Sequence, residues 1–358
     1  MPAIHQFVAG FAGGDAISNE SVMFRDIFRR WGYASEIFSE DRCVQQAARK
    51  HVRDVDVYAA EASPDDIALL HLSIGSKAND VFKSLPCRKA ILYHNVTPAK
   101  YFEVVNKQTA GVLRRGREQI ADLAQVATVN MADSRFNASE LEAVGYRDVA
   151  VLPLVLNFSL LTDDIDARKQ AKLNDGRKNI LFVGRCTPNK KIEDLLRVFA
   201  YYQKTIEPNS RLIHVGSHAG SERYFNLLTT MTKELNLKHV DFAGTVSQPE
   251  LNACYASADA FLCMSEHEGF CIPLIESMIH EVPILAHASA AIPETLGGSG
   301  ILLSERRCDL AAELLDRLVR DPDLRNAVVK QQSERLAQYR ARDLEAEIRE
   351  LLTPLLPS

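Results

Sequence analysis

The sequence lacks the features of a membrane-spanning, secreted or nucleic-acid-binding chain. Its longest run without Asp, Glu, Lys or Arg has 14 residues, whereas a helix needs about 20 apolar residues to span a bilayer. The first residues carry no basic segment and are interrupted by Gly10, Gly13 and Gly14, so no signal peptide is expected. Lys and Arg number 42 against 47 Asp and Glu, a net charge of −5. Nucleic-acid binders usually carry a basic excess, so no nucleic-acid partner is expected.

Cysteine is present, but not in a pattern that binds metal or builds a disulfide framework. The seven cysteines include no C-x-x-C pair, so we predict neither a zinc site nor a set of disulfides. Residues 54–56 and 164–166 each read Asp-x-Asp, but acids two positions apart are common by chance, and no metal is assigned. These absences favour a reducing, cytoplasmic setting. With 46% hydrophobic residues, the chain has the composition of an ordinary globular protein.

Short apolar runs alternate with amphipathic stretches along most of the chain. In the first half the alternation predicts strands at residues 4–9, 67–72, 90–93, 127–130 and 149–152, and helices at 21–31 and 110–125. In the second half it predicts strands at 179–183, 211–215, 240–243, 260–264 and 283–286, and helices at 191–204, 224–235, 248–256 and 273–280. This rhythm indicates a mostly parallel sheet covered on both faces, so we predict an α/β fold with two such sheets.

The charge pattern divides the chain into four segments. Residues 1–157 form the first predicted domain and residues 179–335 the second, while the charged stretch 158–178 is expected to be a linker or a surface helix. Residues 336–358 are expected to form a C-terminal helix able to pack back on the first domain. Open α/β sheets bind ligands at the carboxyl ends of their strands, so two such sheets facing each other would hold the site in the cleft between them.

Residues 265–278, SEHEGFCIPLIESM, carry the strongest chemical signal. They follow a predicted strand, and Pro273 is placed to be the first residue of a helix, where its missing N–H costs nothing. Gly269 permits close backbone approach, and both Glu268 and Glu276 can point at a ligand bound at the helix start. The backbone amides before the helix would lie at the positive end of its dipole, a position suited to phosphate. These amides belong to Phe270, Cys271 and Ile272.

Together with its context, this segment resembles the retaining nucleotide-sugar glycosyltransferases of family 4, which have the GT-B fold. Glu268 and Glu276 look like the paired glutamates of that family. Residues 182–191, FVGRCTPNKK, resemble its strand and loop that bear an Arg and a Lys for the donor diphosphate. In this sequence those two cations are Arg185 and Lys190.

The resemblance extends over nearly the whole chain. Residues 240–259 resemble the family's nucleobase-side segment, and residues 292–300 match its downstream Pro-Glu pair and Gly-rich turn. His94 fits a strand end near the donor sugar. Lys191 departs from a usual Gly, and residues 216–218 read Gly-Ser-His instead of Gly-x-Gly. The flexible loop after the first strand is matched by Gly13, Gly14 and Asp15.

The resemblance implies a GT-B fold, with two Rossmann-like domains facing across a cleft, and a hexosyltransferase that retains anomeric configuration without a metal. The nucleotide sugar is a substrate, so no cofactor is expected. The implied donor is a GDP-linked, mannose-like hexose. The implied acceptor is a glycan or lipid-linked glycan of surface polysaccharide or lipopolysaccharide synthesis. The catalytic residues implied are His94, Arg185, Lys190 and Glu268. The donor-binding residues implied are Gly13, Gly14, Asp15, Val246, Leu251, Gly269, Phe270, Cys271, Ile272 and Glu276.

Charge suggests how these residues would act. Arg185 and Lys190 would oppose the negative charge that develops on the departing diphosphate. By analogy with the family, Glu276 would hold the ribose hydroxyls, and His94 and Glu268 would lie near the transferred sugar. No enzymic nucleophile stands out, so a front-face displacement is favoured, with double displacement left open.

Other functions remain open at this stage. A UDP-linked donor is the runner-up, and a GT-B nucleotide-sugar 2-epimerase or a non-catalytic nucleotide-binding module are alternatives from other classes. A Rossmann dehydrogenase is disfavoured because residues 10–14 do not give G-x-G-x-x-G. The histidines at positions 5, 71, 214, 267 and 287 are expected to be structural.

A basic amphipathic segment suggests a peripheral contact with anionic membrane, at the inner face of the cell membrane. Apolar residues such as Tyr101, Phe102 and Leu113 lie among its cations. These cations are Lys100, Lys107, Arg114, Arg115 and Arg117.

Overall fold

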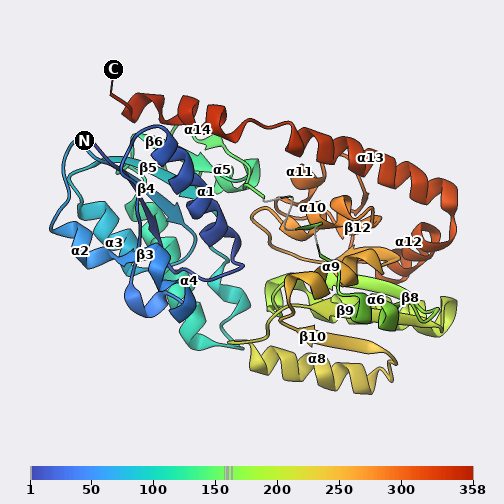
Figure 1. The fold of residues 1–358 in the computed structure, drawn as a ribbon. Helices are drawn as coiled ribbons and strands as arrows, with labels where there is room; N and C mark the ends of the chain where they lie inside the picture. Colours follow the sequence, from blue (N-terminus) through green and yellow to red (C-terminus); the bar gives the residue numbers. More distant parts are fainter. Residues whose placement is uncertain (1, 157, 159–160, 163, 358) are drawn as a thin grey trace. The chain divides into compact units, whose positions relative to one another are not determined.

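The computed structural model describes residues 2–156, 158, 161–162 and 164–357, and the chain divides into two compact units. Unit 1 contains Met1–Lys100, Gln108–Leu156 and Arg342–Ser358, and unit 2 contains Tyr101–Lys107 and Asn157–Ala341. Each unit is built on one parallel β-sheet with helices packed against it (Figure 1). The prediction of two parallel-sheet α/β domains is therefore confirmed.

The sheet of unit 1 has seven parallel strands in the order β3-β2-β1-β4-β5-β6-β7. The strands are β1 (Ile4–Val8), β2 (Ile37–Ser39), β3 (Val52–Asp54), β4 (Ile67–Leu72), β5 (Arg88–Tyr93), β6 (Val129–Ala132) and β7 (Ala150–Val151). The helices are α1 (Ala16–Arg30), α2 (Val55–Ala59), α3 (Lys77–Ser84), α4 (Lys107–Asp122), α5 (Arg135–Glu142) and α14 (Leu344–Leu352).

Alternate residues of β1 show how that sheet is covered on both faces. Successive side chains of a strand point to opposite faces, and all five residues of β1 are buried. On one face Ile4 packs in a core cluster with Phe24 of α1 and Ile348 of α14. On the other face the ring of Phe7 lies 5.7 Å from Tyr58 of α2 and 6.1 Å from Phe82 of α3.

The sheet of unit 2 has six parallel strands in the order β10-β9-β8-β11-β12-β13. The strands are β8 (Lys178–Val183), β9 (Ser210–Val215), β10 (Val240–Gly244), β11 (Ala260–Cys263), β12 (Ile284–His287) and β13 (Ile301–Leu303). The helices are α6 (Ala167–Leu173), α7 (Ile192–Tyr201), α8 (Glu222–Glu234), α9 (Gln248–Ala256), α10 (Ile272–Ile279), α11 (Ile292–Leu296), α12 (Cys308–Arg320) and α13 (Pro322–Arg340).

Two predicted segments can be compared with the structure. Of the two alternatives for 158–178, the surface helix is found: the stretch contains α6, which packs against α9, and its last residue begins β8. The side chain of Asp166 caps α6 by accepting a hydrogen bond from the Lys169 amide at 2.7 Å. Residues 336–358 do not form one helix, because α13 ends at Arg340 and α14 begins at Leu344. The predicted boundary at residue 157 lies outside the described residues.

Candidate active site

The turn between β11 and α10 shapes the centre of the candidate site in unit 2. Cys271 precedes α10 in the left-handed conformation, with φ 69° and ψ 64°. Non-glycine residues rarely adopt positive φ, and such strain clusters at functional sites. The helix starts at Ile272 rather than at Pro273 as predicted, so the proline is its second residue. Phe270 is held in place by the Thr295 hydroxyl, which donates to its carbonyl.

The half-buried Lys190 and the buried Glu268 form an ion pair beside this turn. The Lys190 Nζ lies 2.5 Å from Glu268 Oε2, and the lysine comes from the short turn Pro188–Lys190 after β8. Burial alone would lower the pKa of Lys190, but the facing carboxylate of Glu268 raises it above its usual value. Lys190 therefore carries its charge at neutral pH. A fixed cation in this position is what an anionic ligand requires.

Hydrogen bonds join the two loops that carry this pair. The side-chain amide of Asn189 donates to the carbonyl of His267 at 3.0 Å, and the amide of Glu266 donates to the carbonyl of Asn189 at 2.8 Å. Lys191, which stands where the family usually has a glycine, forms ion pairs with two glutamates. Its Nζ lies 3.0 Å from Glu266 and 3.7 Å from Glu193. These contacts fix the loop after β8 against the loop after β11.

Glu276 lies on α10 and is held by a tyrosine that the motif did not indicate. The hydroxyl of Tyr255, on α9, donates to Glu276 Oε2 at 2.6 Å, and both side chains are buried. Burial raises the pKa of Glu276 above its usual value, and the Tyr255 hydrogen bond acts in the opposite direction. The hydroxyl thus fixes the carboxylate and favours its charged form.

Arg185 is exposed after the end of β8, and contacts from β9 and the residue after it hold the backbone carbonyl of Gly184, directly before Arg185, in place. Its Nη2 lies 3.4 Å from the carbonyl of Ala219. Burial lowers the pKa of His214 to about 4, so this histidine is neutral. Its Nε2 lies 2.9 Å from the carbonyl of Gly184 and donates to it. Gly216 has φ +153°, and a Cβ there would lie 1.9 Å from the same carbonyl. Only glycine fits this close approach.

Val246 and Leu251, predicted on the nucleobase side, are half-buried after β10 and in α9. The turn between them is fixed by a capping box, in which Ser247 and Glu250 satisfy each other's backbone amides. In unit 2 the predicted donor-binding residues therefore follow two strands of one sheet, in the loop after β10 and helix α9, and in the turn after β11 and helix α10.

The remaining predicted residues lie in unit 1. Asp15 caps α1, and its Oδ2 accepts from the Ser18 amide at 2.9 Å. The Gly13 amide donates to Gln45 at 3.0 Å, while Gly14 has φ +78°. Asp15 and the glycines form the loop between β1 and α1. His94 directly follows β5.

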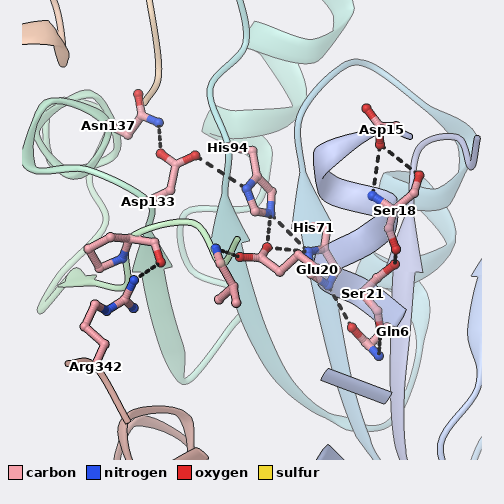
Figure 2. A network of polar contacts seen from close by, with 12 residues as sticks. Gln6, Asp15, Ser18, Glu20, Ser21, His71, His94, Asp133, Asn137 and Arg342 are labelled. Atoms are coloured by element: carbon pink, nitrogen blue, oxygen red, sulfur yellow. Dashed lines mark hydrogen bonds and ion pairs between the residues drawn. The ribbon is translucent and has the colours of Figure 1, made fainter. Parts of the chain in front are cut away.

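Both ring nitrogens of His94 face protein atoms (Figure 2). Its Nε2 lies 3.0 Å from Nδ1 of His71 and 3.5 Å from Oε2 of Glu20. Its Nδ1 lies 3.5 Å from Oδ2 of Asp133. His71, expected to be only structural, is thus a direct partner of the predicted catalytic histidine. No local sequence pattern indicates this cluster, because its members come from separate strands and helices.

Two groups of described residues bring metal-type ligand atoms within 4.8 Å of one another: Glu20, His71 and His94, and Cys263, Glu268 and Cys271. In the first group the two rings are nearly coplanar, at 6°, with centroids 5.2 Å apart. A ring nitrogen lies roughly 1.1 Å from its centroid for bonds of about 1.33 Å, so the nitrogens point head-on at each other. Metal ligands converge on a third point, so this geometry favours an N–H···N hydrogen bond. In the second group Lys190 already neutralises the carboxylate.

The basic segment proposed for membrane contact is divided between the units. Arg115 pairs with Asp80 and Arg117 with Glu140, and Leu113 is buried. Val104 is 82% exposed. No described helix has both the length and the apolar character to cross a membrane. Membrane contact stays a prediction.

Comparisons with known proteins show what the chain is similar to. Residues 163–335 match the family described as glycosyl transferases group 1. Over 171 residues the chain is 31% identical to the uncharacterized glycosyltransferase MJ1607 of Methanocaldococcus jannaschii, covering 47% of this chain and 42% of that protein. Over 143 residues it is 27% identical to O-antigen chain mannosyltransferase B of Escherichia coli, covering 39% and 37%. The chain thus aligns with about two fifths of each relative.

The fold match covers the whole chain. Anabaena Alr3699/HepE, crystallised with UDP-glucose, superposes with a TM-score of 0.75 at 17% identity, covering 98% of this chain and 99% of that one. At this identity the likeness shows the fold, which is GT-B. Unit 2 therefore carries the group 1 glycosyltransferase match within a GT-B architecture.

Proposed function

We propose that this protein is a retaining hexosyltransferase that moves a mannose-like hexose from a nucleoside diphosphate sugar, GDP-linked, to a glycan or lipid-linked acceptor in surface polysaccharide synthesis. The observation that carries the proposal is the ion pair between the half-buried Lys190 and the buried Glu268, just before α10. It places a charged lysine beside the positive end of a helix, within the segment that matches the group 1 family.

The chemistry follows from where charge develops. Cleavage of a sugar–phosphate bond leaves negative charge on the nucleoside diphosphate. Lys190, held protonated, and the exposed Arg185 supply cations for that charge. The amides at the start of α10 add the helix dipole. No metal is needed in this scheme, because the protein supplies the positive charge.

The two glutamates take different roles in the proposal. Glu276, fixed by the Tyr255 hydroxyl, accepts hydrogen bonds from the ribose hydroxyls. Glu268 lies near the hydroxyls of the transferred sugar and keeps Lys190 in place until the diphosphate binds. Neither is assigned as a nucleophile, so the acceptor attacks from the front face and the donor phosphate takes its proton.

The donor and acceptor are proposed from resemblance and from the relatives. One relative is an O-antigen chain mannosyltransferase, which supports a mannose-like sugar and a surface polysaccharide. The fold neighbour holds UDP-glucose, and this favours the UDP-linked alternative as the second candidate.

Nucleotide binding tests the proposal directly. We would measure the unfolding temperature with GDP, UDP, ADP and dTDP, without added metal. Variants Glu276→Gln and Lys190→Gln are compared with Glu234→Gln, an exposed glutamate on α8 of the same unit. Ligand at about 100 times its Kd stabilises a protein by roughly 2.7 kcal/mol.

A shift with GDP, reduced in the two site variants and kept in the control, is the expected result. A shift with UDP alone would select the UDP-linked donor. Product analysis without acceptor separates transfer from 2-epimerisation, because an epimerase changes the sugar alone. No shift with any nucleotide, in folded protein, would contradict the proposal.

A further inference from the structure

A cluster of four buried titratable residues lies within unit 1, where the candidate site uses only one of them (Figure 2). His71 belongs to β4, His94 follows β5, Asp133 follows β6, and Glu20 lies on α1. The side chains of all four are at most 2% exposed. They lie near the carboxyl ends of adjacent central strands, the edge where open α/β sheets bind ligands.

A hydrogen-bonded glutamine fixes the proton positions on His71. The Gln6 side-chain nitrogen donates to the Ser21 carbonyl at 2.9 Å, so its oxygen faces Nε2 of His71, also at 2.9 Å. An amide oxygen only accepts, so Nε2 of His71 carries a proton. The other nitrogen, Nδ1, is the one that meets His94.

Counting protons then gives the charge of the histidine pair. The head-on contact between His71 Nδ1 and His94 Nε2 holds one proton. Nδ1 of His94 makes no hydrogen bond to the described residues but lies 3.5 Å from Oδ2 of Asp133, whose other oxygen accepts from the Asn137 amide, and a facing carboxylate favours a proton on this nitrogen. The pair therefore holds three N–H protons. Two neutral imidazoles hold two, so the pair carries one positive charge whichever ring owns the shared proton.

Carboxylates on both sides stabilise that charge. Glu20 Oε2 lies 3.5 Å from His94 Nε2 and 3.7 Å from His71 Nδ1. Burial alone would lower the pKa of His94, but Asp133, Glu20 and the more distant Asp15 raise it above its usual value. Burial and the neighbouring His94 hold the pKa of His71 well below its usual value, so the charge belongs to His94.

Glu20 responds to the same surroundings. Burial raises its pKa to about 7, against the opposing effects of His94, of the Val155 amide that donates to Oε1 at 3.1 Å, and of Arg342. Arg342 itself donates to the Pro153 carbonyl and pairs with Glu347. Above pH 7, where Glu20 is mostly ionised, the cluster contains one cation between two carboxylates.

We propose that Glu20, His71 and Asp133 are positioning residues that keep His94 protonated on both nitrogens, so that His94 acts as a cation and hydrogen-bond donor and never as a general base. An imidazolium has no lone pair with which to take a proton. The kinetic part of this inference rests on the proposed transferase function; the protonation state itself does not. A doubly protonated His94 also agrees with a reaction in which the donor phosphate, and not a histidine, accepts the acceptor's proton.

The protonation state can be measured without turnover. Protein labelled with ¹⁵N-histidine is examined by NMR at about pH 7.5, one unit above the usual histidine pKa, with His71→Gln and His94→Gln spectra used to assign the signals. We expect three protonated nitrogens in the pair. Two protonated nitrogens, one on each ring, would overturn the proposal even if the protein proves to be a transferase.

The pH dependence of kcat/KM tests the functional part, with the nucleotide sugar identified by the binding screen. A donor role predicts that activity falls on the alkaline side, as His94 loses its proton. Asp133→Asn and Glu20→Gln remove a facing anion, which should move this alkaline limb to lower pH by about one unit or more. A general base would instead lose activity on the acid side.

Asp66→Asn is the matched control. Asp66 is equally buried in unit 1 and accepts from the Ala3 amide and the Tyr58 hydroxyl, at 2.9 Å each, away from the cluster. Its neutralisation should leave the pH profile unchanged. An alkaline limb that stays fixed in Asp133→Asn, or an acid limb that moves in its place, would contradict the positioning role. If no transferase activity exists, the NMR result still decides the charge of the pair.

Discussion

Replacing Gly216 by alanine should disturb Arg185 through the backbone, without touching any charged group. The new Cβ would lie 1.9 Å from the Gly184 carbonyl oxygen, so the loop that carries Arg185 must move. Gly176 offers a matched control, since its φ is +88° and a Cβ there would meet nothing within 4 Å. Gly176→Ala therefore measures the cost of a positive φ alone, about 1–2 kcal/mol.

Gly216→Ala should lower the free energy of unfolding by more than Gly176→Ala does, because the steric clash of the new Cβ adds an overpacking cost of about 1–3 kcal/mol. We expect a total loss of about 3 kcal/mol in the free energy of unfolding of unit 2, measured by urea denaturation. The nucleotide that stabilises the wild type should also bind more weakly to this variant, since Arg185 is displaced. Equal losses in Gly216→Ala and Gly176→Ala, with unchanged nucleotide binding, would refute the argument.

Three further outcomes follow from buried contacts. Tyr255→Phe removes the hydroxyl that donates to Glu276. In urea denaturation this should lower the free energy of unfolding by about 2 kcal/mol, and it should also raise the pKa of Glu276 further and weaken nucleotide binding. Unchanged nucleotide binding would argue against the ribose role of Glu276. The pKa of Glu20 is 4.5 ordinarily and about 7 in the folded protein. Between these two values the Glu20 carboxyl is protonated more in the folded than in the unfolded state, so the free energy of unfolding should fall as the pH rises from 4.5 to about 7. Denaturation at several pH values should show a flatter profile for Glu20→Gln, and identical slopes would contradict the raised pKa. Leu352→Ala should lower the free energy of unfolding by about 3 kcal/mol, because Leu352 is fully buried in the core of unit 1. A loss below about 1 kcal/mol in urea denaturation would show that α14 is loosely packed.

Most of the two sheets could be predicted because their central strands are buried and mostly apolar. The six residues of β4, for example, are all buried, and only His71 interrupts their hydrophobic run. The strands β2, β3 and β13 have three residues each, too few for a periodic signal. The sequence does not distinguish a linker from a surface helix at α6, because only Leu173 of its residues is buried and its amphipathic pattern is therefore faint.

In the candidate site, too, some residues could be predicted from the sequence and others could not. Glu268, Lys190 and Glu276 could be named in advance because they stand in the two segments on which the family resemblance rests. Tyr255 could not, because it reaches Glu276 from another helix. The cluster around His94 depends on sheet order: β1 lies beside β4 and β4 beside β5, and no local spacing encodes which strands become neighbours.

The route of the chain through the two units has a consequence for how the protein is made. The backbone passes between units after Lys100, Lys107, Leu156 and Ala341. Residues 342–358 leave the ribosome after unit 2, yet Ile348, Leu352 and Leu355 complete the hydrophobic core around β1. Synthesis of unit 1 thus starts before that of unit 2 and is completed after it, whereas unit 2 has all its residues once position 341 is made. Until α14 is made, the apolar face of β1 lacks part of its cover, and in this interval a nascent chain exposes surface that invites chaperones or aggregation.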